Sequence, residues 1–353
     1  MTRVVAKHGF ILAMSVIVGA ALLAAGVATA PSAEAGQRWC NGRLLNSGKD
    51  LRAINGASNR TFCIASSASR PGGRYKIGRR VIRPGNNVTL IGVPVKRRPD
   101  GYGHRYRIKA RSKIHGTGPA IIDLSRKHTI TIRNLDLSGA RGSCSNRHAG
   151  TIVTNGVNLK ISNSRLHHGF AQAIGHSSGG TFRHLEVDHN GSKCLRSHIS
   201  GGIKTGSSKG YAISHSFVHH NMGPGIWCDA SCDNFRVVRN VVVRNSGQGI
   251  RYEHGSNSGR CPSCSAAILY NIARHNGLVS SDSDRKNAGI GVSSSENARI
   301  AFNRLGGNYN SNGIYLQDGR HPLRNIDIRG NALRGDKIKS CGKAGVSCKG
   351  NKK

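Results

Sequence analysis

The sequence predicts an all-β solenoid, in which short strands repeat along one axis. From about residue 120 onward, a Gly or Ala followed by Ile recurs with a period of about 24 to 32 residues. Apolar alternation with a period of two fills the intervals, as in Ile130-Thr131-Ile132, and no stretch of the mature chain sustains helical spacing over about three turns. The chain has 47 Gly and only 5% aromatic residues, so a large all-helical core is disfavoured.

Polar residues are predicted to mark the corners of each coil. The repeated step is Ala173-Ile174, Gly202-Ile203, Gly225-Ile226, Gly249-Ile250, Gly289-Ile290 and Gly313-Ile314. Most of these steps follow an Asn, at Asn190, Asn221, Asn245, Asn276 and Asn308, and a second series precedes it at Ser216, Asn240, Asn271 and Asn303. Asn suits a corner because its short amide tolerates left-handed backbone and can hydrogen-bond its equivalent one coil away.

In this repeat the chain resembles the right-handed parallel β-helix proteins, the pectate-lyase-like group of secreted carbohydrate-active enzymes, over roughly residues 80 to 335. The resemblance implies a right-handed parallel β-helix of about ten coils, with a short N-terminal cap and a disulfide-stapled C-terminal tail. It implies function only broadly, since the same scaffold carries lyases, hydrolases, epimerases and binding proteins.

The chain is predicted to have four parts. Residues 1–35 combine a basic start, an uncharged apolar run and the small-x-small pattern Ala33-Glu34-Ala35, which indicates a signal peptide. The apolar run is long enough to span a bilayer, so an uncleaved anchor is the alternative, and either way the rest is secreted or at the cell surface. Residues 36–80 are expected to cap the first coil, 81–335 to form the solenoid and 336–353 to form a basic tail.

Ten cysteines in an exported chain predict five disulfides. Local spacing, and elimination for the last pair, predicts Cys40–Cys63, Cys228–Cys232, Cys261–Cys264, Cys341–Cys348 and Cys144–Cys194. The alternative is a four-thiolate zinc site formed by the two central pairs, but an oxidising compartment favours disulfide bridges.

Stacking of the coils predicts two outward columns of side chains on one sheet. Neighbouring coils lie about 4.8 Å apart, and if each Ile points inward, the residues one and three places later point outward. The first column is Lys204, Trp227, Arg251, Gly291 and Tyr315, and the second is Gly206, Asp229, Glu253, Ser293 and Gln317.

Asp229 and Glu253 are the candidate catalytic residues. The chain has only 16 acids, and these two are predicted to lie about 5 Å apart on one face, the separation of a retaining glycosidase pair. They resemble the Asp and Glu that some β-helix glycosidases carry on successive coils, which implies Asp229 as nucleophile and Glu253 as acid/base. Trp227 is then a platform for a sugar ring, with Lys204 and Arg251 as ligands of its hydroxyls or carboxylate. Tyr315 and Gln317 extend the predicted substrate-binding face.

Other interpretations of these residues stay open. Asp229 and Glu253 could pair with Lys204 and Arg251 as a surface charge ladder, and Trp227 could serve packing alone. Insertions at 191–200, 256–265 and 277–288 either wall a cleft or are merely tolerated. The histidines His167, His168, His189, His219, His220 and His275 could supply a base or form a corner ladder. No cofactor or metal site is expected, because calcium needs several carboxylates and few are present.

The charge of the chain favours an anionic partner. With 53 Lys and Arg against 16 Asp and Glu, the net charge is +37, which attracts polyanions, yet nothing resembles a specific reader of nucleic-acid bases. We therefore expect a monomeric enzyme that cleaves a polysaccharide, preferably acidic, by retaining hydrolysis. The first alternative is a lyase acting on uronate polymers, in which Lys204 or a histidine takes the proton, Arg251 neutralises the carboxylate and Tyr315 is the acid. The second alternative is a non-catalytic surface protein that binds polyanions.

Overall fold

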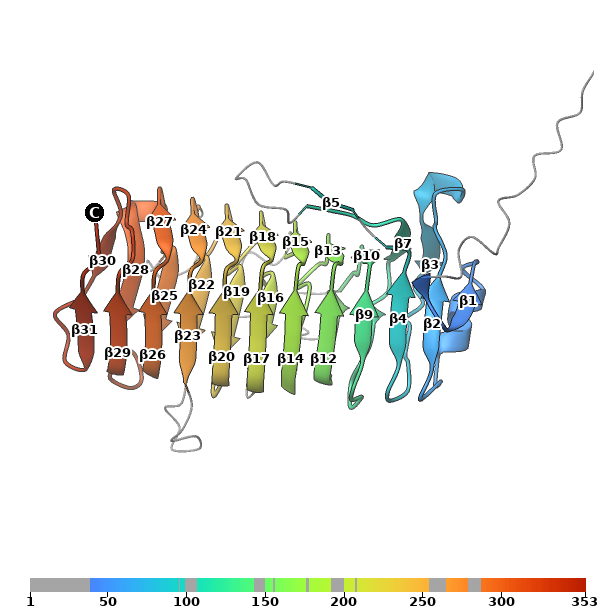
Figure 1. Cartoon of the computed structure of the whole chain (residues 1–353), viewed down its shortest axis with the longest axis horizontal. Helices are drawn as coiled ribbons and strands as arrows, with labels where there is room; N and C mark the ends of the chain where they lie inside the picture. The colour runs from blue at the N-terminus through green and yellow to red at the C-terminus, as the bar shows by residue number, and fades with distance from the viewer. Residues whose placement is uncertain are drawn as a thin grey trace, which may run out of the picture.

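Parallel strands coil around one long axis in the computed structural model (Figure 1). It describes residues 39–94, 96–98, 107–142, 150–154, 156–175, 178–191, 200–206, 208–253, 265–278 and 287–353. The predicted all-β solenoid is confirmed. Within these ranges the helices are the short 3-10 turns η2 (Asp50–Ile54), η3 (Pro71–Gly73) and η4 (Tyr309–Ser311). None of them has the length and apolar character needed to cross a membrane.

Three faces of parallel strands make up the solenoid. The longest sheet has 12 strands, in the spatial order β1 (Arg43–Leu45), β2 (Thr61–Ile64), β4 (Thr89–Gly92), β9 (Thr131–Arg133), β12 (Val157–Ser162), β14 (Ser178–Arg183), β17 (Lys209–Ser214), β20 (Asp233–Val238), β23 (Ala266–Leu269), β26 (Glu296–Ala301), β29 (Arg324–Arg329) and β31 (Val346–Lys349). The second has nine strands, β27 (Arg304–Gly306), β24 (Ile272–Arg274), β21 (Val241–Val243), β18 (Phe217–His219), β15 (Glu186–Asp188), β13 (Arg165–His167), β10 (Leu135–Ser138), β7 (Ser112–Gly116) and β3 (Tyr75–Gly78).

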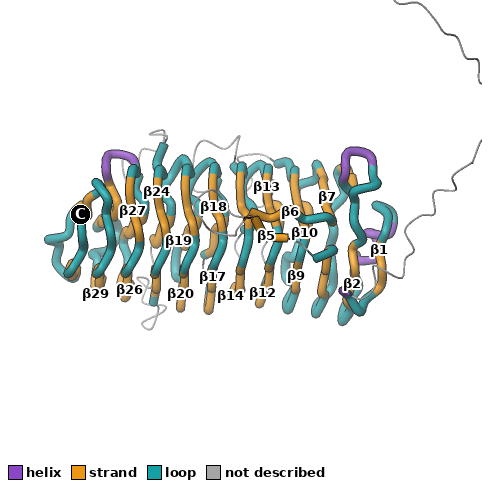
Figure 2. The backbone as a smooth tube through the Cα atoms, turned by 45° about the horizontal axis from the view of Figure 1, so that its top comes forward, coloured by secondary structure: helices purple, strands orange, loops and turns teal. Residues whose placement is uncertain are grey.

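The third face carries the candidate site. Its six-stranded sheet is β16 (Ile203–Thr205), β19 (Ile226–Asp229), β22 (Ile250–Glu253), β25 (Ile290–Ser293), β28 (Asn312–Gln317) and β30 (Lys337–Lys339). The pair β8 (Ala120–Ile122) and β11 (Thr151–Val153) continues it through single bridges at Ile174. A separate antiparallel hairpin, β5 (Lys96–Arg98) and β6 (Arg107–Lys109), lies beside β10 and β13 in Figure 2.

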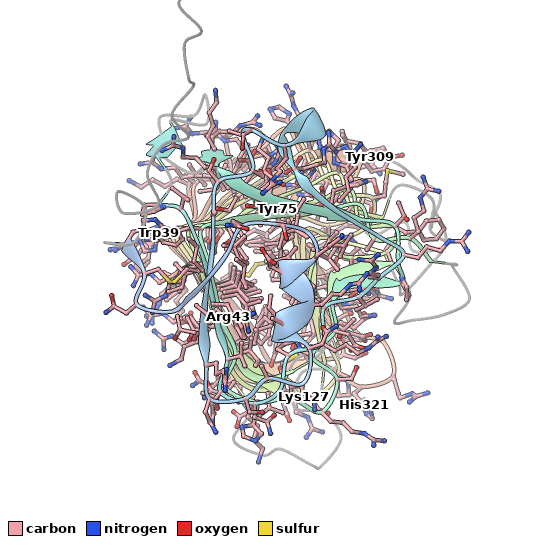
Figure 3. All side chains as sticks on the ribbon, turned by 90° about the vertical axis from the view of Figure 1, so that its right-hand side faces the viewer. Trp39, Arg43, Tyr75, Lys127, Tyr309 and His321 are labelled. Carbon is pink, nitrogen blue, oxygen red and sulfur yellow. A yellow bond between two sulfur atoms is a disulfide. The ribbon has the colours of Figure 1, made fainter. Side chains whose placement is uncertain are left out.

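The core is a single apolar column along the axis. The inward Ile residues predicted from the repeat are each no more than 1% exposed: Ile203, Ile226, Ile250, Ile290 and Ile314. Seen along the axis, side chains fill the centre and others radiate outward (Figure 3). Because side chains alternate along a strand, the period-two pattern of the sequence sets which residues enter this column.

Asn side chains form ladders at two corners, as the repeat predicts. Asn245 Nδ2 donates to Asn276 Oδ1 at 3.0 Å, and Asn221 Nδ2 donates to Asn245 Oδ1 at 2.9 Å. The left-handed backbone, however, belongs to the residue before the ladder Asn, such as His220 (φ 52°) and His275 (φ 52°). The buried amides are used for the ladder, so the preceding residue makes the bend and its side chain projects outward.

Disulfides are present at three predicted pairs: Cys40–Cys63, Cys228–Cys232 and Cys341–Cys348. The Cys228–Cys232 bridge uses two of the four thiolates that the zinc alternative requires. The zinc alternative is therefore wrong. The predicted pairs Cys144–Cys194 and Cys261–Cys264 lie outside the described residues, as does the expected signal segment.

The stacked strands extend past both predicted ends of the solenoid. Strands β1, β2 and β3 precede residue 81 and pair with later strands, while β30 and β31 follow residue 335 and continue two of the sheets. The longest sheet therefore has 12 strands where about ten coils are expected. The division of the chain into a cap at 36–80 and a tail at 336–353 stays a prediction.

Candidate active site on the six-stranded sheet

The two predicted columns form on this sheet. Strand pairing aligns Lys204 with Trp227, Trp227 with Arg251, and Asp229 with Glu253. The next strands continue both columns through Gly291 and Ser293 to Tyr315 and Gln317. The register inferred from the repeat is therefore confirmed, and the two acids are direct neighbours across β19 and β22.

Each of the two acids forms an ion pair with a cation of the other column. Lys204 Nζ lies 2.8 Å from Asp229 Oδ2, and Arg251 Nη2 lies 2.5 Å from Glu253 Oε1. The Ser293 hydroxyl is 3.4 Å from the same Glu253 oxygen. These are the pairs of the charge-ladder alternative, but Lys204 is only 3% exposed and so is not an ordinary surface charge.

Trp227 lies between the two cations. Lys204 Nζ is 3.7 Å and Arg251 Cζ is 4.8 Å from the centroid of the indole ring, and the residue is 3% exposed. The expectation of an open platform for a sugar ring is therefore wrong for this arrangement, because cations cover the ring. The Trp227 Nε1–H is buried and has no hydrogen-bond partner among the residues that the structure describes, which is a costly state that a ligand acceptor could relieve.

Burial changes the acid–base behaviour of Lys204. Removal from water lowers its pKa, the Asp229 carboxylate opposes this, and Arg251 lowers it further, so the pKa lies below the ordinary value for lysine. A lysine with a depressed pKa releases its proton more readily. The site thus holds an amine suited to accept a proton, next to two carboxylates.

Tyr315 and Gln317 lie farther along the sheet from Asp229 and Glu253 than Lys204 and Arg251 do. Strand β25 separates them from β22, so Tyr315 is two coils, about 10 Å, from Arg251. Within the described ranges, no hydrogen bond joins either residue to Asp229 or Glu253. Their predicted role in binding substrate requires a ligand that spans several coils.

Gln248 is a site residue that the sequence interpretation missed. Its side-chain amide lies over Gly291, where an added Cβ would be 2.3 Å from Gln248 Oε1. Gly291 is the one glycine in the described strands of the first column, and it lies between Arg251 and Tyr315. A glycine at an outward strand position is the signal that could have indicated a side chain arriving from elsewhere.

The family comparison addresses the central part of the solenoid. Residues 110–277 match a family model described as right handed beta helix region. This chain is a right-handed parallel β-helix. No curated protein matches the β-helix in sequence.

Solved structures with a similar fold include an epimerase module and two lyases. The A-module of mannuronan C-5 epimerase AlgE4 from Azotobacter vinelandii has a TM-score of 0.44 at 12% identity, covering 82% of this chain and 85% of that one. Alginate lyase from a Paenibacillus species has a TM-score of 0.45 at 11% identity, with 82% and 93% covered. Pectate lyase Pel9A has a TM-score of 0.43 at 12% identity, with 86% and 72% covered.

A second polar cluster lies on the nine-stranded sheet of the β-helix. Glu186 and Asp188 point outward from β15 yet are 2% and 0% exposed. Arg165 donates to both oxygens of Asp188, at 2.8 and 2.7 Å, and Arg107 of the β5–β6 hairpin lies 3.0 Å from Glu186. The backbone N–H of Ile108 also donates to Glu186, at 2.7 Å. The chain has only 16 acids, and two of them lie at alternate positions of this strand. That pattern is the sequence signal that could have indicated this cluster.

Histidines lie beside these acids. The rings of His168 and His189 stack at the corner beside the sheet, and so do those of His189 and His220. The expected hydrogen-bonded corner ladder is thus a stack of rings, and the printed hydrogen bonds of these histidines run to His167, Asp188 and His219 instead. Burial, helped by repulsion from His219 and His189, lowers the pKa of His220 to about 4. The His220 imidazole is therefore neutral at neutral pH.

Proposed function

We propose that this β-helix is an enzyme that acts on an acidic polysaccharide bound along the outer face of the six-stranded sheet. The observation that carries the proposal is the register of Asp229 with Glu253 on adjacent strands, beside the cations Lys204 and Arg251. The net charge of +37 supports an anionic substrate. Three disulfides support a location outside the cytosol.

Retaining hydrolysis is the reaction that the paired acids support. Asp229, whose carboxylate is held by the Lys204 ammonium, is the nucleophile and attacks the anomeric carbon while the glycosidic C–O bond breaks. Glu253 gives its proton to the departing oxygen. Water, deprotonated by Glu253, then cleaves the glycosyl–aspartate bond and restores both acids.

The position of Arg251 beside Glu253 favours acidic sugars as substrates of this reaction. Its guanidinium contacts the carboxylate of Glu253, the general acid of this reaction. A uronate carboxylate offers Arg251 a second anionic partner. Binding of an acidic substrate would thus draw Arg251 to the sugar and release the Glu253 side chain for the glycosidic oxygen.

β-Elimination is the second candidate, favoured by the depressed pKa of Lys204. The neutral amine would take the proton from the carbon next to the uronate carboxylate, with Arg251 neutralising that carboxylate. The electron pair forms a carbon–carbon double bond as the glycosidic C–O bond breaks, and the departing oxygen takes a proton from water or from Tyr315.

Product analysis separates these reactions. The full-length protein is incubated with uronate polymers, and both reducing ends and ultraviolet absorbance of unsaturated product are followed. Reducing ends without absorbance, lost in Asp229→Asn and Glu253→Gln, support hydrolysis, whereas absorbance lost in Lys204→Met supports elimination. Asp327→Asn is the matched control, because Asp327 pairs with Arg329 at the same strand spacing on another sheet. Binding without cleavage of any polymer would overturn the enzymatic proposal in favour of the binding module.

A further inference from the structure

An open groove runs along the corner between the longest sheet and the nine-stranded sheet. It follows the short turns that join β20 to β21, β23 to β24 and β26 to β27 (Figure 1), and its volume is about 530 Å³. One wall is a column of corner residues, Arg239, Tyr270, Phe302 and Gly330. Strand register places these four residues in successive coils. The groove is therefore four coils long, and it lies away from the sheet that carries Asp229 and Glu253.

Two aromatic side chains of this wall are exposed to water. Tyr270 is 50% and Phe302 is 42% exposed, in a chain with only 5% aromatic residues. Their rings stack on each other, with centroids 5.1 Å apart and an interplanar angle of 16°. Single exposed apolar residues are common on proteins, whereas exposed rings gathered in one groove are typical of a binding site.

The backbone at this corner does not favour aromatic residues. Tyr270 and Phe302 have left-handed backbone, at φ 57° and 58°, which is uncommon for bulky side chains and costs folding free energy. At the same corner of earlier coils stand Asn134 and Asn163, a residue type that tolerates this backbone. The coil itself therefore does not require a ring here, and a role outside folding accounts for the two that are present.

The side of Phe302 toward the next coil lies beside a glycine. A Cβ added at Gly330 would be 2.8 Å from Cδ1 and Cε1 of the Phe302 ring. Gly350 holds the corner one coil further on, and nothing lies within 4 Å of a Cβ added there. No corner side chain of these two coils covers the ring, so a sugar ring can place its C–H groups against it.

Arginines lie on both walls of the groove. Arg239 Cζ is 5.9 Å from the centroid of the Tyr270 ring, and the opposite wall consists of Val241, Ile272 and Arg304. Both arginines are exposed, and none of the described residues that line the groove is acidic. A guanidinium group matches a carboxylate with two parallel hydrogen bonds. The groove thus combines an apolar surface with charges complementary to an anion.

We propose that this corner groove binds a stretch of acidic polysaccharide, with sugar rings against Phe302 and Tyr270 and uronate carboxylates at Arg239 and Arg304. Coils lie about 4.8 Å apart, so the four coils span about 14 Å along the axis, which suits an extended chain better than a single small anion. The proposal rests on the substrate class of the proposed function but uses none of its catalytic residues. A second contact of this kind keeps a polymer on the protein when the first is released.

Oxidative footprinting locates the bound sugar chain. The full-length Asp229→Asn/Glu253→Gln protein is exposed to hydroxyl radicals with and without oligogalacturonate or oligomannuronate, and the oxidation of each residue is measured by mass spectrometry. We expect at least one of these oligomers to reduce the oxidation of Tyr270 and Phe302 severalfold. Tyr309, which is 36% exposed and does not line the groove, should be oxidised as before. Cello-oligosaccharide, the neutral counterpart, should protect the two rings at much higher concentration only.

A variant of each wall tests the residues named in the proposal. Phe302→Asn keeps a residue that suits left-handed backbone and leaves Tyr270 as the reporter. Arg239→Asn combined with Arg304→Gln leaves both rings as reporters. In each variant, titration of the protection should show an affinity at least about tenfold weaker than in the parent protein. The arginine variant should also bind with less dependence on salt.

The matched control removes the same charge from the same coils. Arg236 and Arg299 are exposed on β20 and β26 of the longest sheet, outside the groove. Arg236→Gln combined with Arg299→Gln should therefore leave the protection of Tyr270 and Phe302 unchanged. Circular dichroism and the unfolding temperature check that every variant is folded.

The outcomes separate this groove from the proposed active site. Absence of protection by both uronate oligomers, equal protection of Tyr309, or equal weakening in the Arg236 and Arg299 control would overturn the proposal. So would protection by single-stranded DNA alone, because such a polymer also binds through arginines and aromatic rings. A wild type that cleaves no polymer leaves the footprint readable, and a failed footprint leaves the cleavage test on the six-stranded sheet standing.

Discussion

Lys204 and Asp229 lie on neighbouring coils, and the lysine Nζ is 2.8 Å from the aspartate Oδ2. The lysine is 3% exposed and its ammonium also lies over the Trp227 ring, 3.7 Å from the centroid. The charge is therefore held away from water by one anion and one aromatic face. A buried cation costs more desolvation than a surface one, which favours a functional reason for it.

The pH dependence of stability should report this burial. The folded pKa of Lys204 lies below its ordinary value of 10.5, so between the two values the unfolded chain binds more protons. The free energy of unfolding contributed by Lys204 therefore rises with pH across that window. Urea unfolding followed as the pH rises toward 10.5 should show a smaller rise in the free energy of unfolding in Lys204→Met than in the wild type. The exposed Lys209→Met is the control, and equal slopes in all three proteins would contradict the prediction.

Trp227 should tolerate loss of its ring nitrogen but not of its ring. Because no described residue hydrogen-bonds Nε1, Trp227→Phe loses no hydrogen bond seen in the structure and should cost less than about 2 kcal/mol in the free energy of unfolding. Trp227→Ala leaves a cavity beneath two cations and should cost about 3 to 5 kcal/mol. Chemical denaturation measures both, and a Trp227→Phe cost as large as that of Trp227→Ala would show that Nε1 is bonded after all.

Gly291→Ala should impair activity more than stability. The new methyl group would meet the Gln248 amide, a flexible side chain that can move away at little cost in folding free energy. Moving it changes the surface between Arg251 and Tyr315, so we expect a loss of at least about tenfold in kcat/KM on whichever polymer is cleaved. Gly342→Ala, at a glycine with no atom within 4 Å of the added Cβ, should match the wild type in the same assay. Unchanged kcat/KM in Gly291→Ala would remove Gln248 from the site.

The Asn ladders should contribute much of the stability of the corners. Asn245→Ala would leave the backbone N–H and the amide of Asn221 buried without their acceptor, at a cost of about 1 to 3 kcal/mol for each group. We therefore expect a fall of at least about 3 kcal/mol in the free energy of unfolding by urea. Asn325→Gly breaks an exposed contact with Asn297 at a residue with left-handed backbone (φ 48°), which glycine tolerates, and should cost under about 1 kcal/mol, so similar losses in the two variants would contradict the ladder argument.

The repeat was sufficient to predict the neighbours of the candidate site. Asp229 and Glu253 are one period apart, and parallel in-register stacking converts that spacing into direct pairing of their strands. The same rule placed Lys204, Trp227 and Arg251 in one column. What the period could not predict was the depth of the column, because Trp227 points outward and is still buried.

The stacked histidines beside the nine-stranded sheet are a second case in which the sequence predicts position but not contacts. The sequence places His168, His189 and His220 at equivalent corners, but the contacts of His167 with His168 and of His219 with His220 depend on side-chain directions that alternate along the strands. The acids that contact these histidines come from two coils, Asp136 on β10 and Glu186 and Asp188 on β15. The spacing along the chain does not encode these contacts.

The sequence by itself determined the coil, its register and the identity of the residues in each outward column. The fixed period sets which residues pair across neighbouring coils, and the alternation along a strand sets whether each side chain points inward or outward. Only the tertiary structure decided which of those outward residues are sheltered, which carboxylate pairs with which cation, and where Gln248 lies. These outcomes depend on side chains and segments from other coils, which shield charges from water and compete for the same partners. Such contacts do not repeat with the period of the sequence.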